Sequence, residues 1–263
     1  MGTFTTKDRA TLHFEVRGRD KGREPLVFVH GWCSNISHWR FQVDHFAKNR
    51  KILCIDRRGQ GKSTTPGSGH NAKQHAQDIA DVVKSCGLRN VVVVGHAGGG
   101  PGTLSFLSQY PRLVKAGVMI EAGMYPAPRL HNAKSPLGML LGSMLDELKS
   151  SGGDVAFKAM YASFFDPKCD PQIVKKVIDE AANTPMAVIQ AELRGIIVST
   201  QHIAKSIAQP ILWLTAEAVD QAQIAKQLKR VCFAQTVGSG HFPQLEVPGQ
   251  VNAMIDTFCD QLP

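Results

Sequence analysis

The chain has 263 residues, enough for one large α/β domain with an inserted subdomain. Hydrophobic residues make up 43% and charged residues 20%, which is typical of a globular protein and excludes a disordered one. The net charge is +8, but the basic residues are dispersed along the chain rather than gathered on one element. We therefore interpret the positive charge as a solvated surface and expect no nucleic-acid partner.

The six cysteines form no C-x-x-C pair, a usage typical of a reducing compartment. The N-terminal residues contain no apolar segment of the kind found in a secretory signal. Since no apolar run approaches the length of a membrane span, membrane insertion is not expected. The sequence favours a cytoplasmic location and leaves the oligomeric state open.

The first half of the chain alternates strand and helix patterns. Short apolar runs, typical of strands that are buried on both faces, lie at residues 12–16, 25–30, 51–56, 91–95 and 114–121. Residues 71–86 have the spacing of an amphipathic helix, which Gly87 closes. A helix also follows the fourth run. This alternation predicts a doubly wound, mostly parallel sheet.

Strand patterns stop after residue 123. Four helical segments follow, at residues 137–149, 153–164, 171–182 and 186–198. Strand patterns then return at residues 210–215 and 231–237, with helices at 222–228 and 251–259. We therefore expect an α/β core from residues 1–123 and 206–263, interrupted by a helical cap over residues 124–205.

A glycine-rich turn follows the fourth apolar run. Gly95 and Gly99 occupy the glycine positions of the nucleophile-elbow pattern G-x-S-x-G, and Ala97 stands where the serine belongs. The elbow is a strained turn that exposes one side chain, so Ala97 marks a nucleophile position that lacks its hydroxyl. Two explanations remain open: an engineered Ser→Ala replacement, or a natural lineage without the nucleophile.

Backbone donors for an oxyanion are expected next to this turn. His30, Gly31 and Trp32 end the second apolar run, where a loop would direct an N–H toward the elbow. The predicted donors are the N–H groups of Trp32 and Gly98. The segment 56–63 resembles a phosphate-binding loop, but Asp56 stands where that loop needs glycine. We interpret it as a structural turn and expect no cofactor and no metal.

A histidine and an acid complete the candidate triad. His241 follows the last strand pattern behind two glycines, a position from which it can reach the carboxyl edge of the sheet. The acid that orients it is Glu121, at the end of the strand after the elbow, or Asp220, beyond the next-to-last strand. Both preserve the order nucleophile, acid, histidine, and we favour Glu121.

Taken together, these motifs resemble the α/β-hydrolase fold over essentially the whole chain. The resemblance implies an eight-stranded sheet, a helical cap and hydrolysis of an ester or lactone by a Ser-His-acid triad. In this chain Ala97 would leave that hydrolase inactive. Members similar to haloalkane dehalogenases carry the acid where Glu121 stands, whereas Asp220 is one residue out of the more common register.

Two segments, residues 31–33 and 241–246, also resemble cofactor-free dioxygenases that cleave 3-hydroxy-4-quinolones. That resemblance implies that a histidine–acid pair deprotonates the substrate, and that the elbow serine is not an acyl nucleophile. Gly98 departs from this family, which has a second histidine there. A non-catalytic, ligand-binding homologue is the third hypothesis.

The predicted substrate is an apolar organic small molecule, and we expect it to be a fairly large ester or lactone. Methionine and aromatic side chains are frequent in the expected cap, and such side chains suit an apolar ligand. Packing of the cap's own helices explains any one of them equally well. The predicted substrate-binding residues are Gly31, Trp32, His96, Met124, Met160 and Phe242.

Overall fold

The computed structural model describes residues 1–123, 136–149, 152–196 and 201–263. Its strands form a single sheet in the order β1-β2-β4-β3-β5-β6-β7-β8. Their bounds are β1 Gly2–Thr5, β2 Thr11–Arg17, β3 Leu26–Val29, β4 Ile52–Ile55, β5 Val91–His96, β6 Val114–Ile120, β7 Ile211–Thr215 and β8 Val231–Gln235. Only the β1–β2 and β2–β4 pairs of this described sheet are antiparallel, which confirms the doubly wound, mostly parallel arrangement.

Residues of each central strand alternate between two apolar layers. Val91 and Val93 of β5 pack with α2 (Ala72–Ser85) and α3 (Gly100–Gln109) on one face. Val92 and Val94 pack on the other face, against α1 (Arg40–Phe46), α11 (Pro248–Asp260) and the 3-10 turn Ile36–Trp39. Burial on both faces explains why these strands appear in the sequence as continuous apolar runs.

Strand β1 and the short helices α1, α8 (Gln201–Ala204) and α10 (Pro243–Glu246) were not anticipated from the sequence. Strand β1 lies at the edge of the sheet, and its residues are half-buried and exposed in alternation, so it has no continuous apolar run. Helices α1, α8 and α10 are short, and their boundaries carry weak sequence patterns. Within the described ranges, no helix is both long and apolar enough to cross a membrane.

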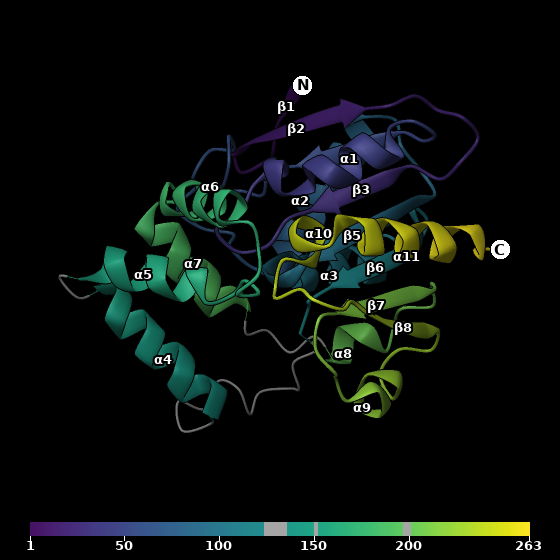
Figure 1. Cartoon of the computed structure of the whole chain (residues 1–263). Coiled ribbons are helices and arrows are strands. Elements are labelled where there is room, and N and C mark those ends of the chain that lie inside the picture. Colours follow the sequence, from purple (N-terminus) through teal and green to yellow (C-terminus); the bar gives the residue numbers. More distant parts are fainter. Residues whose placement is uncertain (124–135, 150–151, 197–200) are drawn as a thin grey trace.

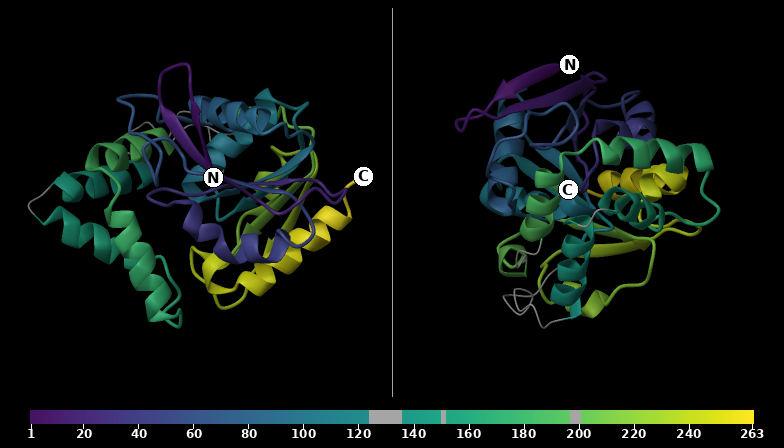
Figure 2. Two further views of the ribbon diagram at one scale, coloured as in Figure 1. Left: turned by 90° about the horizontal axis from the view of Figure 1, so that it is seen from above. Right: turned by 90° about the vertical axis from the view of Figure 1, so that its left-hand side faces the viewer.

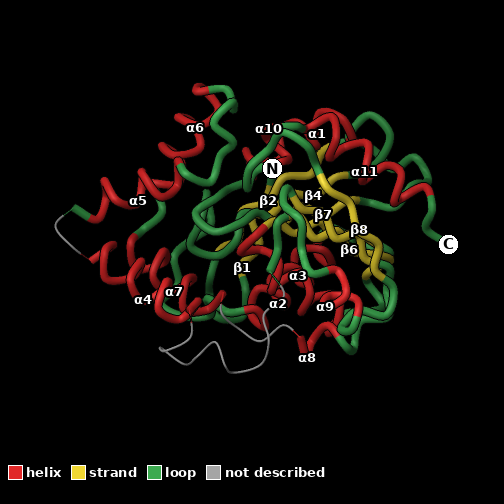
Figure 3. Tube along the Cα trace, turned by 60° about the horizontal axis from the view of Figure 1, so that its bottom comes forward, coloured by secondary structure: helices red, strands yellow, loops and turns green. Residues whose placement is uncertain are grey.

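Four helices between β6 and β7 form a separate layer that we call the cap. They are α4 (Pro136–Lys149), α5 (Gly153–Ala162), α6 (Pro171–Ala182) and α7 (Met186–Ile196). Figure 1 shows these helices beside the α/β core, and Figure 2 shows from two further directions that they lie toward one end of the sheet. The chain then returns to the core through α8 (Gln201–Ala204), and α9 (Gln221–Ala225) later connects β7 to β8; Figure 3 shows both helices on the core side of the molecule.

A third apolar cluster joins the cap to the core. Trp32 and Phe242, from two core loops, are buried against Phe157 and Tyr161 of α5. The ring of Trp32 meets Phe157 edge-on at a centroid distance of 5.8 Å. Because Trp32 follows the end of β3, this cluster holds the cap over the carboxyl edge of the sheet, where an α/β fold places its site.

Candidate active site

The turn after β5 has the backbone of a nucleophile elbow. Ala97 has φ +44°, in the left-handed region that costs a non-glycine residue about 1 kcal/mol. Glycine is needed on both sides: a Cβ on Gly95 would collide with Thr103, and one on Gly99 would collide with the carbonyl of His30. The elbow geometry is therefore retained around a methyl group.

His241 and Glu121 meet beside this turn. The Nδ1 atom of His241 lies 3.1 Å from Oε2 of Glu121, and the other carboxylate oxygen accepts a 2.6 Å hydrogen bond from the Ala216 N–H. Glu121 follows β6 with φ +49°, which turns its side chain out of the strand path. A carboxylate that accepts Nδ1–H leaves Nε2 of His241 as the free basic nitrogen. The side chain of His241 is 33% exposed, so a substrate can reach it.

Asp220, the alternative acid, lies elsewhere. It is exposed and forms the N-cap of α9, where its carboxylate accepts a 2.9 Å hydrogen bond from the Gln223 N–H. The structure thus brings His241 together with Glu121 and not with Asp220.

The loop that carries His241 is fixed from the cap and from the elbow. The His241 N–H donates to the carbonyl of Phe164 at 2.7 Å, directly after α5. On the other side, the His241 carbonyl accepts a 2.7 Å hydrogen bond from Nε2 of His96, the residue before Ala97. Burial, together with the nearby His241, lowers the pKa of His96 well below its usual value, so its ring stays neutral. His96 thus differs from the substrate-lining role expected for it, since its fully buried ring positions His241.

The loop after β3 passes over the elbow. A Cβ on Gly31 would lie 3.4 Å from the Cβ of Ala97 and 2.8 Å from Nδ1 of His96, so only glycine allows this approach. Among the described residues, the N–H of the next residue, Trp32, has no hydrogen-bond acceptor. An unpaired backbone donor beside the elbow is what an oxyanion hole provides.

The predicted substrate-binding residues are distributed over several environments. Trp32 and Phe242 are buried in the cluster between core and cap, and Phe242 stacks on Phe165 at 4.6 Å. Met160 is partly buried against the same cluster. Met124 lies outside the described residues. A groove of about 680 Å³ runs between the core and α6, but neither Ala97 nor His241 lines it.

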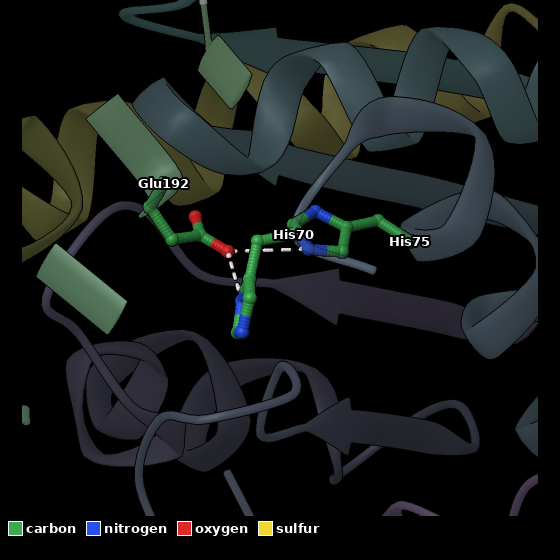
Figure 4. A group of neighbouring side chains, drawn as sticks. All are labelled: His70, His75 and Glu192. Atoms are coloured by element: carbon green, nitrogen blue, oxygen red, sulfur yellow. Dashed lines mark ion pairs between the residues drawn. The ribbon is translucent and has the colours of Figure 1, made fainter. Parts of the chain in front are cut away.

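A charged cluster that the sequence did not reveal lies behind Gly98. A cavity of about 10 Å³ is lined there by Gly98, Arg57, His70, His75 and Glu192, among others. Figure 4 shows the two histidine rings directed at the carboxylate of Glu192, which α7 contributes. Their nearest nitrogens lie 3.5 Å (His70) and 3.2 Å (His75) from Oε1. No local spacing could have indicated this cluster, because its members come from the turn after β4, from α2 and its approach, and from the cap.

The donor set His70, His75 and Glu192 has ligand atoms within 4.8 Å of one another, as a metal site requires. However, Nη2 of Arg57 lies 2.9 Å from Nδ1 of His75. A guanidinium only donates, so Nδ1 accepts and the proton of His75 sits on Nε2, facing Glu192. Arg57 also lies 2.5 Å from Glu192, which places a permanent positive charge where a cation would bind. These groups fit a closed ion-pair network better than a metal site.

Comparison with known proteins agrees with this fold. A family model for the alpha/beta hydrolase fold matches residues 24–248. A non-heme chloroperoxidase of Streptomyces lividans is 30% identical over 153 residues, 57% of this chain and 54% of that protein. A bifunctional esterase/perhydrolase of Acinetobacter calcoaceticus is 36% identical over 126 residues, 46% of this chain and 45% of that protein. The matched stretch spans about half the length of these curated relatives.

The whole fold is similar to solved structures. An esterase from Exiguobacterium antarcticum superposes with a TM-score of 0.89 over 99% of this chain and 100% of that one, at 17% sequence identity. At that identity the likeness concerns the fold alone. The match to the family model covers most of the sequence, and the sheet order and elbow agree with it. The chain therefore belongs to the α/β-hydrolase fold family.

Proposed function

We propose that this site is built for an ester or lactone of an apolar molecule, and that Ala97 stops it before acyl transfer. The observation that carries the proposal is the pairing of His241 with Glu121 beside a strained elbow that presents only a methyl group. The similarity to a bifunctional esterase/perhydrolase supports the same class of reaction.

Each group has a defined role in the proposed reaction. With a serine at position 97, Nε2 of His241 would take the hydroxyl proton, and Glu121 would stabilise the imidazolium that forms. The N–H groups of Trp32 and Gly98 would stabilise the negative charge on the substrate oxygen. With Ala97 there is no nucleophile, so the chain binds the substrate and leaves it intact. None of these steps needs a cofactor.

The proposed ligand is a small apolar organic molecule, and nucleic acid and membrane insertion play no part. Support comes from the apolar cluster that joins the cap to the core near the elbow. Its aromatic rings, including Trp32, Tyr161 and Phe242, make the surroundings of the elbow apolar, which favours an apolar acyl or ring system.

The test is Ala97→Ser, assayed on p-nitrophenyl esters of short and long acyl chains and on lactones. We expect hydrolysis to rise by about 10⁴-fold or more over the parent chain, because loss of a triad member costs that much. Ala97→Gly is the matched control, since it relieves the backbone at this position but adds no nucleophile. A folded Ala97→Ser protein that stays at the level of Ala97→Gly on all substrates would contradict the proposal.

A second candidate is base catalysis without a nucleophile, as in cofactor-free dioxygenation of a 3-hydroxy-4-quinolone. It is favoured by one observation: the His241–Glu121 pair is complete although position 97 has no hydroxyl. The two candidates differ in what the unaltered chain does. Under the hydrolase proposal, an oxygen electrode detects no uptake with the quinolone. Oxygen consumption that is lost in His241→Ala would establish the second candidate instead.

If the chain is a non-catalytic binding module, Ala97→Ser adds no activity, yet an apolar ligand still raises the melting temperature. Melting curves with and without ligand therefore complete the separation of the three hypotheses.

A further inference from the structure

One guanidinium, that of Arg57, connects three parts of the molecule behind the elbow. Its Nη1 donates to the carbonyl of Gly31 at 3.1 Å, and its Nη2 contacts Glu192 at 2.5 Å and His75 at 2.9 Å. Arg57 is 4% exposed and Glu192 1% exposed. Burial alone would raise the pKa of Glu192, but Arg57 together with His75 and His70 outweighs burial and holds that pKa well below the usual value. The pair is therefore charged in the folded protein.

The carbonyl of Gly31 is held by a second donor. The N–H of Arg57 donates to Nε2 of His30 at 2.9 Å, so the neutral His30 ring carries its proton on Nδ1. That Nδ1 lies 2.9 Å from the carbonyl oxygen of Gly31 and donates to it. Burial lowers the pKa of His30 well below its usual value, which keeps the ring neutral, and its two hydrogen bonds fix the tautomer. Two donors thus fix the direction of one carbonyl.

Fixing that carbonyl also fixes the predicted oxyanion donor. The C=O of Gly31 and the N–H of Trp32 belong to the same planar trans peptide, so they point in opposite directions. As long as Arg57 and His30 hold the oxygen on one side, the Trp32 N–H is directed to the other. This is the N–H that has no acceptor within the described part of the chain.

The cap supplies the counter-charge of Arg57 and two further hydrogen bonds to Trp32. Glu192 lies on α7, and the same helix accepts a 3.1 Å hydrogen bond from Nε1 of Trp32 at the carbonyl of Ile189. From α5, the hydroxyl of Tyr161 donates to the carbonyl of Trp32 at 2.8 Å. The peptide groups on both sides of Trp32 are therefore oriented by contacts that depend on the cap.

We propose that Arg57 and Glu192 are positioning residues that direct the Trp32 N–H at the oxyanion, so that docking of α7 onto the core makes the site competent. The part of this inference that concerns catalysis rests on the proposed hydrolase function. The part that concerns the orientation of the peptide group does not, and it can be measured in the chain as it stands.

The sequence offers a single-signal assay, because residues 31–32 are its one Gly-Trp pair. Labelling glycine with ¹³C at the carbonyl and tryptophan with ¹⁵N gives one HNCO cross-peak, which reports the Gly31 carbonyl and the Trp32 N–H together. We expect Arg57→Lys and Glu192→Gln to move the carbonyl signal upfield and to displace the amide signal. Arg57→Lys keeps the charge but cannot reach all three partners with one ammonium group.

Arg58→Lys is the matched control. Arg58 is the neighbouring residue, is fully buried and pairs with Asp78 at 2.6 Å, but within the described structure its side chain forms no hydrogen bond with residues 30–32. It reports the effect of losing a buried arginine fork at this turn. If Arg57→Lys and Glu192→Gln leave the cross-peak where Arg58→Lys leaves it, the proposal is overturned, whatever the protein catalyses.

The second measurement uses the Ala97→Ser background. We expect Arg57→Lys and Glu192→Gln to lower kcat by about 10- to 100-fold with little change in KM, because an oxyanion donor acts in the transition state. A displaced cross-peak with unchanged kcat would overturn the catalytic part. A displaced cross-peak in a protein whose Ala97→Ser form is inactive would leave the peptide-orienting link standing and remove the proposed function.

Discussion

Two glutamates flank the elbow, and they are built in opposite ways. Glu121 comes from the core sheet, has a 17% exposed side chain and makes one contact to His241 and one to a backbone N–H. Glu192 comes from the cap, is 1% exposed and is surrounded by Arg57, His70 and His75. In the proposed reaction, a carboxylate in contact with His241 suits the task of stabilising the imidazolium that forms there. Complete burial in a charged network suits a group whose task is to hold other atoms in place.

The largest expected effect separates the two glutamates by activity. In the Ala97→Ser background, Glu121→Gln is expected to lower the rate by about 10⁴-fold, because the amide cannot stabilise the imidazolium of His241. Its effect on stability should be small, since the side chain is partly solvated. Ester hydrolysis and urea unfolding measure the two effects. If Glu121→Gln retains most of the rate, Glu121 is not the orienting acid.

The second prediction is the reverse for Glu192: a large effect on stability. Glu192→Ala is expected to lower the free energy of unfolding by about 3–5 kcal/mol, because it leaves the charge of Arg57 buried without a counter-charge. The exposed pair formed by Lys175 and Asp179 is the control, and Asp179→Ala should have almost no effect on unfolding. Urea titrations at constant salt give both values. Equal effects of the two substitutions would refute the distinction between buried and exposed charge.

The third prediction concerns the pH dependence of stability. Burial lowers the pKa of four histidines, that of His38 to about 3, and the others are His30, His75 and His96. In the unfolded chain these rings take up protons near pH 6.5, whereas in the folded protein they do not. The unfolded state then binds more protons, so stability is retained above pH 6.5 and is lost as the pH falls below it.

Urea unfolding curves recorded between about pH 7.5 and about pH 5, the range in which free histidine titrates, measure this loss of stability. His38→Gln removes one titrating ring and should reduce the slope by at most about 1.4 kcal/mol per pH unit. A stability that stays constant down to the range where carboxylates titrate would show that the buried rings accept protons in the folded state.

The smallest expected effect belongs to Asp220. Asp220→Ala removes the N-cap of α9 and should cost about 1 kcal/mol of unfolding free energy. In the Ala97→Ser background, adding Asp220→Ala should leave the hydrolysis rate equal to that of Ala97→Ser alone, in contrast to Glu121→Gln. A large loss of rate with Asp220→Ala would return the acid role to Asp220.

The sequence by itself determined the features that depend on short stretches of chain. Strands buried on both faces appear as apolar runs, and the elbow appears because Gly95 and Gly99 are needed within one turn. The eight-stranded, mostly parallel sheet that the family resemblance implied is confirmed. The edge strand β1 was missed because an alternating, half-exposed strand leaves a weak pattern.

Only the tertiary structure decided which distant side chains meet. His241 and Glu121 are 120 residues apart, and Arg57 and Glu192 are 135 apart, so no spacing along the chain could pair them. The sequence left Glu121 and Asp220 both open as the acid, and the fold brings only Glu121 to His241. Arg57 lay in a segment interpreted as a structural turn. Its role became visible once the cap placed Glu192 against it. A charged side chain can be buried only where the fold supplies a partner that offsets the free-energy cost of its burial.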